Sequence, residues 1–273
     1  MPMGRETSAR PQPARRATRR FASSSTARYL FLSTRPLHVL AFLTPLILFY
    51  EIGSIVYLSG MAAGVDVSAR RLLRIFFEHF GAFSLHLPGM ALAAVLLIWH
   101  VLERDRWALS WKVLAGMAAE SLVWTLPLLV LGLFFSQQAG PGPGPGLLAM
   151  SGDMASLPWQ ARLTLSLGAG IYEELLFRLI AIAALHAVLV DLFKVPDRAG
   201  YAISALIASV AFAAYHDIWT SGGLDVPLAV YCLLAGLYLS GVFIMRGFGL
   251  AVAAHAWYDV MALVVLRHGP TGQ

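Results

Sequence analysis

The chain consists of apolar runs of about 20 residues separated by short polar stretches, and a helix of that length spans the hydrocarbon core of a bilayer. The runs lack the alternation of apolar and polar residues that the strands of a membrane barrel require. Backbone groups in hydrocarbon must then be satisfied within helices. We therefore predict an all-α, polytopic transmembrane helical bundle of about seven spans. The expected spans are 37–58, 86–102, 113–135, 160–190, 200–218, 226–245 and 248–267.

One segment, 66–82, has the pattern of an amphipathic helix rather than that of a span. Its arginines cluster on one side of the helix and its large apolar residues lie largely on another. We expect this helix to lie in the membrane interface. The arginines are Arg70, Arg71 and Arg74, and the apolar residues are Leu72, Ile75, Phe76 and Phe80.

Composition divides the chain into an arm, a transmembrane domain and a tail. Residues 1–36 contain eight arginines and one acid and are rich in Ser, Pro and Ala, so we expect a disordered cytoplasmic arm. The transmembrane domain, 37–267, is expected to consist of a front half, a Gly/Pro linker and a catalytic back half, before a short tail. These four segments are 37–135, 136–159, 160–267 and 268–273.

The charge pattern supports a membrane protein with a cytoplasmic N-terminus. Apolar residues make up 58% of the chain and charged residues only 13%, whereas a soluble domain has about a quarter charged residues. The positive-inside rule places the arm in the cytoplasm. We expect the protein to be integral to the inner (plasma) membrane of the cell. We expect the arm to contact membrane lipids and not nucleic acid. An organelle transit peptide is the alternative.

Ionisable residues within the apolar runs mark the candidate site, because such groups are costly to place in a membrane. Glu174 and Arg178 are four residues apart, so they share one helix face and can pair, whereas Glu173 is turned away by about 100°. The pair can be structural while Glu173 acts as a general base. Alternatively, both acids neutralise Arg178 as a clasp that packs helices together.

Two histidines extend this candidate site. His216 follows Phe212 by four residues and His255 precedes Asp259 by four, so each histidine shares a helix face with its partner. Taken alone, each imidazole is typical of a hydrogen-bonded packing residue. Buried polar groups on three spans persist only if they satisfy one another or bind something. We therefore expect them to converge on one interior cavity.

The motifs EExxxR, FxxxH and HxxxN/D resemble, in order and spacing, those of the CPBP family of CAAX-protease and bacteriocin-processing enzymes, relatives of the type II CAAX prenyl endopeptidases. The resemblance covers about 160–267. It implies an intramembrane endopeptidase of the glutamate type, without a metal or other cofactor, that cleaves a membrane-associated protein or peptide. The motif residues are Glu173, Glu174 and Arg178, then Phe212 and His216, then His255 and Asp259.

The resemblance also implies roles for these residues. Glu173 and His216 would activate the attacking water, and His255 with Asp259 would hold the oxyanion, while the Glu-Arg pair fixes the geometry. Several relatives have Asn where this chain has Asp259. Because an ionised carboxylate repels an oxyanion, we expect Asp259 to orient His255 through a hydrogen bond rather than to contact the oxyanion.

Three other hypotheses stay open. A zinc hydrolase could use Glu173, His216 and His255 as ligands, although the HExxH motif is absent. A rhomboid-like serine protease could use Ser240 with His255, although Tyr238 replaces the first glycine of its GxSG motif. The third hypothesis is a non-catalytic membrane scaffold, chaperone or immunity protein that keeps the polar cluster.

The expected spans contain one conflict. His216 lies roughly 24 Å along its span and His255 only about 10 Å along its own, at about 1.5 Å per residue, yet both spans run in the same direction. The two imidazoles can meet only if the helix ends differ from those expected, or if Gly247 and Gly249 mark a break that starts the last helix deep in the membrane.

Overall fold

A computed structural model describes residues 25–59, 67–79, 81, 86–138, 157–216, 218–220 and 222–266. Segment 1–24 of the arm, residues 139–156 of the linker and the tail 268–273 lie outside the described residues, so the expectations for them stay predictions.

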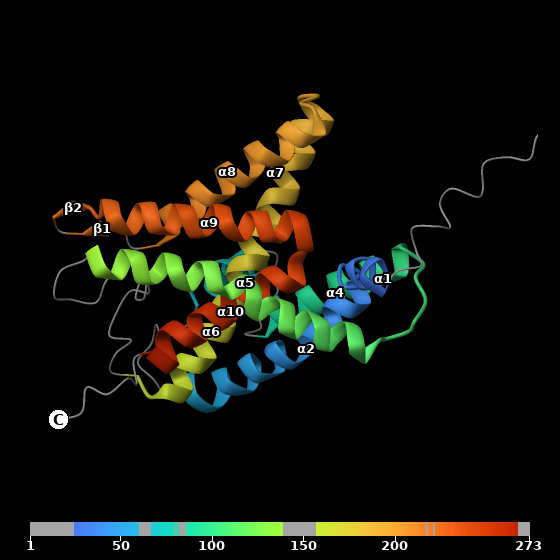
Figure 1. The fold of residues 1–273 in the computed structure, drawn as a ribbon, viewed down its shortest axis with the longest axis horizontal. Helices are drawn as coiled ribbons and strands as arrows, with labels where there is room; N and C mark the ends of the chain where they lie inside the picture. Colours follow the sequence, from blue (N-terminus) through green and yellow to red (C-terminus); the bar gives the residue numbers. More distant parts are fainter. Residues whose placement is uncertain are drawn as a thin grey trace, which may run out of the picture.

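The front half of the described chain is a set of helices joined by short connections (Figure 1). Proline lies in the first turn of α2 and of α4, where its fixed φ favours a helix start and no intrahelical N–H is lost. The elements are α1 (Ser25–Leu32), α2 (Pro36–Gly53) with a π-helical extension (Ser54–Leu58), α3 (Ser68–His79), α4 (Leu87–Leu102) and α5 (Trp111–Gln138).

The back half contains the helices that carry the three motifs. A two-stranded antiparallel hairpin, β1 (Trp219–Thr220) with β2 (Gly223–Leu224), joins α8 to α9. Asp225 caps α9 by accepting a hydrogen bond from the backbone N–H of Leu228. The helical elements are α6 (Trp159–Glu174), η3 (Leu175–Ile182), α7 (Ala183–Ala187), η4 (Val188–Leu192), α8 (Asp197–Tyr215), α9 (Val226–Arg246), α10 (Phe248–Val260) and η5 (Met261–Val265), of which η3, η4 and η5 are π-helical.

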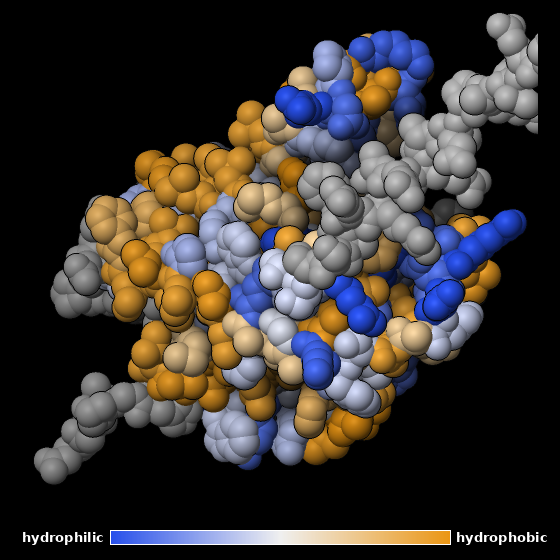
Figure 2. Space-filling model, turned by 45° about the vertical axis from the view of Figure 1, so that its right-hand side comes forward, coloured by the Kyte–Doolittle hydropathy of each residue, from blue (hydrophilic) through white to orange (hydrophobic). Residues whose placement is uncertain are grey.

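Six helices of the described chain are long and apolar enough to cross a membrane. The remaining expected span, 86–102, corresponds to the shorter helix Pro88–Leu102, which at about 1.5 Å per residue reaches roughly 22 Å, less than the hydrocarbon thickness. Figure 2 shows hydrophobic side chains over a broad part of the surface, with hydrophilic ones gathered towards the right-hand side. The prediction of an all-α polytopic bundle is confirmed, and the protein is integral to a membrane.

The end of the expected disordered arm is helical instead. Helix α1 lies within the range 1–36, and its Tyr29 donates a hydrogen bond to Glu120 of α5. Arg246, at the end of α9, pairs with the same carboxylate and donates to Ser33. These contacts lie 91 or more residues apart in the chain, so the composition of the arm gave no sign of them.

Helix α3 forms within the segment expected to be amphipathic, and Leu72, Ile75 and Phe76 are exposed. Arg70 departs from the expected pattern, because its side chain is buried and paired with Glu51 at 3.1 Å. The charge of this arginine is neutralised inside the bundle, which explains why a helix on the expected outer side can contain it despite the positive-inside rule.

The conflict in depth is resolved by one long helix. Residues from Trp159 to Leu192 form a continuous helix of 34 residues, and its second half projects from the bundle together with α8 (Figure 1). Helix α8 returns along this projection. At about 1.5 Å per residue, both Glu173 and the end of α8 lie about 28 Å from the turn between the two helices. His216, which follows the last residue of α8, therefore reaches the level of Glu173.

A backbone break also starts the last helix inside the bundle. Gly247 has a φ of 84°, a conformation that favours glycine, and it separates α9 from α10. The preceding Arg246 is buried. Of the two sites expected for a break, Gly247 and Gly249, the structure uses the first.

Candidate active site

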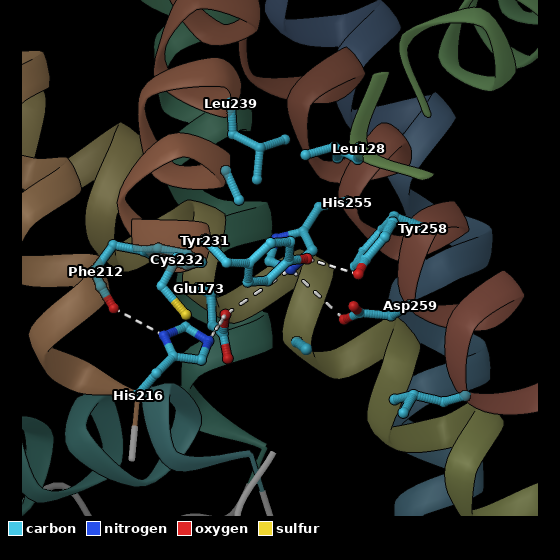
Figure 3. Close-up of a pocket in the computed structure, with 13 residues that line it drawn as sticks. Leu128, Glu173, Phe212, His216, Tyr231, Cys232, Leu239, His255, Tyr258 and Asp259 are labelled. Carbon is cyan, nitrogen blue, oxygen red and sulfur yellow. Dashed lines mark hydrogen bonds and ion pairs between the residues drawn. The ribbon is translucent and has the colours of Figure 1, made fainter. Parts of the chain in front are cut away.

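Four of the six predicted site residues line one interior cavity, whose volume is about 50 Å³ (Figure 3). A water molecule needs roughly 10 to 15 Å³ by this measure, so the cavity has room for a few waters. Glu173 comes from α6, His216 from the end of α8, and both His255 and Asp259 come from α10. The expectation that the motifs converge on a common interior agrees with this arrangement.

Glu173 lies between the two imidazoles. Its Oε2 is 3.9 Å from Nε2 of His216 and 3.9 Å from Nε2 of His255. Both separations exceed the length of a hydrogen bond, so the carboxylate faces each ring without bonding directly to it. The Glu173 carboxylate is also nearly inaccessible to bulk solvent, with 6% of its side chain exposed.

His216 is oriented by the backbone of its own motif. Its Nδ1 lies 2.8 Å from the carbonyl oxygen of Phe212. A carbonyl can only accept, so Nδ1 carries the proton and donates, and Nε2 is the nitrogen that faces Glu173. The ring also lies 4.5 Å from the Phe212 ring. These two contacts give the FxxxH spacing a physical reason.

His255 is oriented by the ion pair that the EExxxR motif predicts. Its Nδ1 lies 2.8 Å from Oε1 of Glu174, and Nη1 of Arg178 lies 3.0 Å from the same oxygen. Glu174 and Arg178 are fully buried behind the cavity. The pair thus fixes one nitrogen of the imidazole and leaves the other directed at Glu173.

The guanidinium of Arg178 connects this pair to two more helices. It donates to the carbonyl oxygen of Gly236 in α9 at 3.3 Å, and its Cζ lies 4.3 Å from the ring centroid of Phe212 in α8. A buried guanidinium is stabilised by acceptors and aromatic faces of this kind. Arg178 therefore links its own helix directly to α8 and α9, and it reaches His255 of α10 only through Glu174.

Asp259 has a different position from the one expected. Its Oδ2 lies 3.5 Å from Nε2 of His255, the nitrogen that faces the cavity. The hydrogen bond that orients the ring comes from Glu174 instead. The expectation that Asp259 orients His255 through a hydrogen bond is not met in this geometry.

Close packing of α6 on α10 brings Glu173 near His255. A Cβ added to Gly170 would lie 2.7 Å from the backbone nitrogen of Ala256, a distance that real contacts do not show. Any side chain at Gly170 would therefore push the two helices apart. The absence of a side chain at Gly170 thus allows the close approach of α6 and α10.

Residues 155–261 match the family model described as Type II CAAX prenyl endopeptidase Rce1-like. This segment is an Rce1-like domain. No curated protein and no solved structure matches the chain. The resemblance to the CAAX-protease family is confirmed, and the Rce1-like domain contains all six residues of the candidate site.

The sequence did not single out three polar residues that line the cavity of the Rce1-like domain. Tyr231 and Tyr258 meet there, with 2.6 Å between their hydroxyl oxygens. Cys232 is 1% exposed, and its side chain points towards the same space as His216 (Figure 3). The two tyrosines could have been found from the sequence because each places a hydroxyl in an otherwise apolar span.

The structure bears on the serine-protease hypothesis through the contacts of Ser240 in the Rce1-like domain. The hydroxyl of Ser240 donates to the carbonyl oxygen of Gly236 at 2.8 Å and lies 3.3 Å from Ser209, so it is engaged away from His255. Within the described part of the chain, no group of three or more His, Cys, Asp or Glu residues could hold a metal ion. The zinc hypothesis is left to experiment.

Proposed function

We propose that the protein is an intramembrane endopeptidase that hydrolyses a peptide bond in a membrane-associated protein or peptide by glutamate-type chemistry. The observation that carries the proposal is the Glu173 carboxylate, 3.9 Å from each of two oriented imidazoles, at the wall of a small cavity inside a membrane bundle. The Rce1-like family match supports the class of reaction.

Glu173 is suited to be the base in this reaction. A water about 2.8 Å from both the Glu173 carboxylate and Nε2 of His216 would lie to one side of the line that joins them. The water oxygen attacks the carbonyl carbon of the peptide, and its proton passes to Glu173. When the tetrahedral intermediate collapses, the C–N bond breaks and that proton passes to the leaving amine.

His255 is suited to stabilise the oxyanion of the intermediate. With Nδ1 held by Glu174, its Nε2 faces the cavity, and a proton on Nε2 can be donated to the developing charge. A donor that is already oriented needs no reorganisation during the reaction. Asp259 is 3.5 Å from the same nitrogen and can balance the charge of a protonated ring.

The size of the cavity limits how a substrate reaches these residues. About 50 Å³ is enough for the attacking water, but ligand pockets that enclose small organic molecules measure about 300 Å³ or more. A peptide must therefore displace part of the cavity wall before its scissile bond can lie between Glu173 and His255.

The proposal is tested with Glu173→Gln, which keeps the shape of the side chain and removes the base. We would compare the protein termini of membranes from cells with the wild-type chain and cells with the variant. A new terminus present only with the wild type defines the cleaved junction, and a quenched-fluorescent peptide that spans it supplies the assay. We expect kcat to fall by about 10³-fold. Cleavage of this peptide by Glu173→Gln at the wild-type rate would disprove the proposed function.

A further inference from the structure

The first turn of α3 contacts the two residues that immediately precede Glu173 and His216. On the α6 side, the hydroxyl of Tyr172 donates to Oε1 of Glu51 at 2.7 Å, and Glu51 is in turn paired with Arg70 of α3. On the α8 side, the hydroxyl of Tyr215 interacts with the Ser68 side chain and the Ala69 backbone at the start of α3. The first turn of α3 is therefore linked to the residues next to Glu173 and next to His216.

The link on the α6 side is a buried cluster built around Glu51. Arg70 lies 3.1 Å from Oε2 of Glu51, donates to the hydroxyl of Tyr50 at 3.1 Å, and has its Cζ 4.9 Å from the centroid of the Tyr50 ring. His86, at the start of α4, contacts the same carboxylate through Nδ1. Four elements thus share one charge pair. Breaking such a pair leaves a buried charge without its partner, so it resists separation.

The link on the α8 side uses backbone donors that every helix leaves open. The first N–H groups of a helix have no acceptor within the helix, and Ala69 is the second residue of α3. The hydroxyl of Tyr215 is the polar group that interacts with this end of the helix. The contact holds the end of α8, which is also the point where His216 leaves the helix.

Little apolar packing holds α3 in place by itself. Leu72, Ile75 and Phe76 are exposed at 49%, 40% and 57%, while Ala69 and Leu73 are its buried apolar residues. The polar contacts of the first turn therefore decide where α3 lies against α6 and α8. Arg74, one turn further along, pairs instead with Glu78 of the same helix at 3.4 Å, and about a third of its side chain is exposed.

We propose that Glu51, Arg70, Tyr172 and Tyr215 are positioning residues that set the distance between Glu173 and His216. The inference rests on the proposed function. Through α3, Tyr172 fixes the rotation of α6 at Glu173 and Tyr215 fixes the end of α8 at His216, which keeps the two reacting groups at 3.9 Å. None of the four residues lines the cavity, so none acts on the substrate directly.

The test compares single changes that remove one link each. Tyr215→Phe and Tyr172→Phe remove only a hydroxyl, Arg70→Met removes the charge pair, and Arg74→Met is the matched control on the same helix. Using the quenched-fluorescent junction peptide, we expect the first three to lower kcat by about 10- to 100-fold, since a misplacement of about 1 Å has effects of this size. KM should change by less than about twofold, because substrate binding is not altered. Arg70→Lys, which can still reach Glu51, should recover part of kcat.

A second measurement needs no substrate. Cys232 is the only cysteine of the chain and lines the cavity beside His216, so its rate of alkylation by N-ethylmaleimide in the purified full-length protein reports on access to the site. We expect Arg70→Met and Tyr215→Phe to raise this rate by about tenfold over wild type, the same factor as the lower bound on kcat. Arg74→Met should leave the rate unchanged.

The outcomes separate the two proposals. Wild-type kcat and alkylation rates in Arg70→Met, Tyr172→Phe and Tyr215→Phe overturn the positioning role, and so does an equal fall of kcat in Arg74→Met, because α3 then acts only as general support. If Glu173→Gln is active, the proposed function fails. The alkylation rates alone then decide whether the first turn of α3 maintains the cavity, and unchanged rates overturn that claim as well.

Discussion

Two polar clusters in this bundle, a partly buried one around Glu120 and a buried one around Glu173, differ in how completely their groups are paired. Around Glu120, Arg246 donates from Nε at 2.6 Å and from Nη2 at 2.8 Å, and Trp124 donates at 2.9 Å. Tyr29 adds a further donor to the same carboxylate. Both carboxylate oxygens accept hydrogen bonds, so the contacts of Glu120 hold α1, α5 and α9 together.

Around Glu173 the partners remain apart. Both imidazoles lie 3.9 Å from the carboxylate, and a small cavity lies beside all three groups. Residues of similar chemistry thus stabilise the fold where donors and acceptors meet directly. Where other contacts hold such residues apart, their unused hydrogen-bond donors and acceptors are available to a water and a substrate. The difference between the clusters is one of spacing and not of composition.

The largest effects should come from removing the central carboxylate of each cluster, and they should be opposite in kind. Glu120→Gln leaves Arg246 without its charge partner, so we expect Tm to fall by about 5 to 10 °C, as for a broken, partly buried ion pair. Its kcat at low temperature should stay within about threefold of wild type. Thermal unfolding and the peptide assay on the same samples measure both quantities.

Glu173→Gln should show the reverse, with a large loss of kcat and a Tm close to that of the wild type. A destabilised Glu173→Gln together with an inactive Glu120→Gln would show that both clusters serve the fold and the reaction alike. In that case, the contrast between paired and separated groups would not explain the site.

Smaller effects should distinguish the two acids near His255. Glu174→Gln weakens the contact that orients the ring through Nδ1, so we expect kcat to fall by about 100-fold, the upper range for residues that orient a functional imidazole. Asp259→Asn changes a group 3.5 Å from the other nitrogen and should cost about tenfold or less. If Asp259→Asn is the more damaging of the two, the orientation of His255 depends on Asp259 after all.

Much of the site could be predicted because its residues recur at helical spacing. The Glu174-Arg178 pair follows from the number of residues per turn, and so does the turn of Glu173 away from their helix face. Both are found. The convergence of three spans follows from the cost of polar groups in a membrane. Arguments of this kind concern one helix at a time, or one general property of the environment.

Contacts between distant segments could not be predicted in the same way. The contact of Tyr172 with Glu51 joins residues 121 positions apart, and that of Arg246 with Glu120 joins residues 126 apart. The depth of His216 depends on a helix that continues through a π-helical segment after Glu174. Hydropathy gives the length of an apolar run but not how far a helix projects from the bundle, so the spans alone placed the two histidines at different levels.

Treatment with a metal chelator is expected to leave the activity almost unchanged. This experiment also tests whether the groups around Glu173 are less completely paired than those around Glu120. A zinc ion bound by Glu173, His216 and His255 would make this cluster as fully paired as the one around Glu120, because a structural metal saturates its ligands. We expect incubation with EDTA or 1,10-phenanthroline to change kcat/KM by less than about twofold. Loss of activity that added Zn²⁺ restores would support the zinc hydrolase and reject the metal-free reaction.

The smallest effect on stability is expected at the more exposed ion pairs that Arg35 forms with Glu103 and Asp105. Hydrogen bonds from Arg35 lower the pKa of both carboxyls below their ordinary values. A carboxyl with a lowered folded-state pKa contributes stability above its unfolded-state pKa and loses it as the pH falls through the folded-state pKa. Arg35→Gln should therefore lower Tm by at most about 2 °C at pH 7, since exposed pairs are weak and screened by salt. The difference from wild type should begin to shrink as the pH falls below about 4, where the carboxyls of the unfolded chain become protonated, and it should vanish below the lowered folded-state pKa values. A difference that persists in acid would show that Arg35 stabilises the protein through its position over Phe31 and not through the two acids.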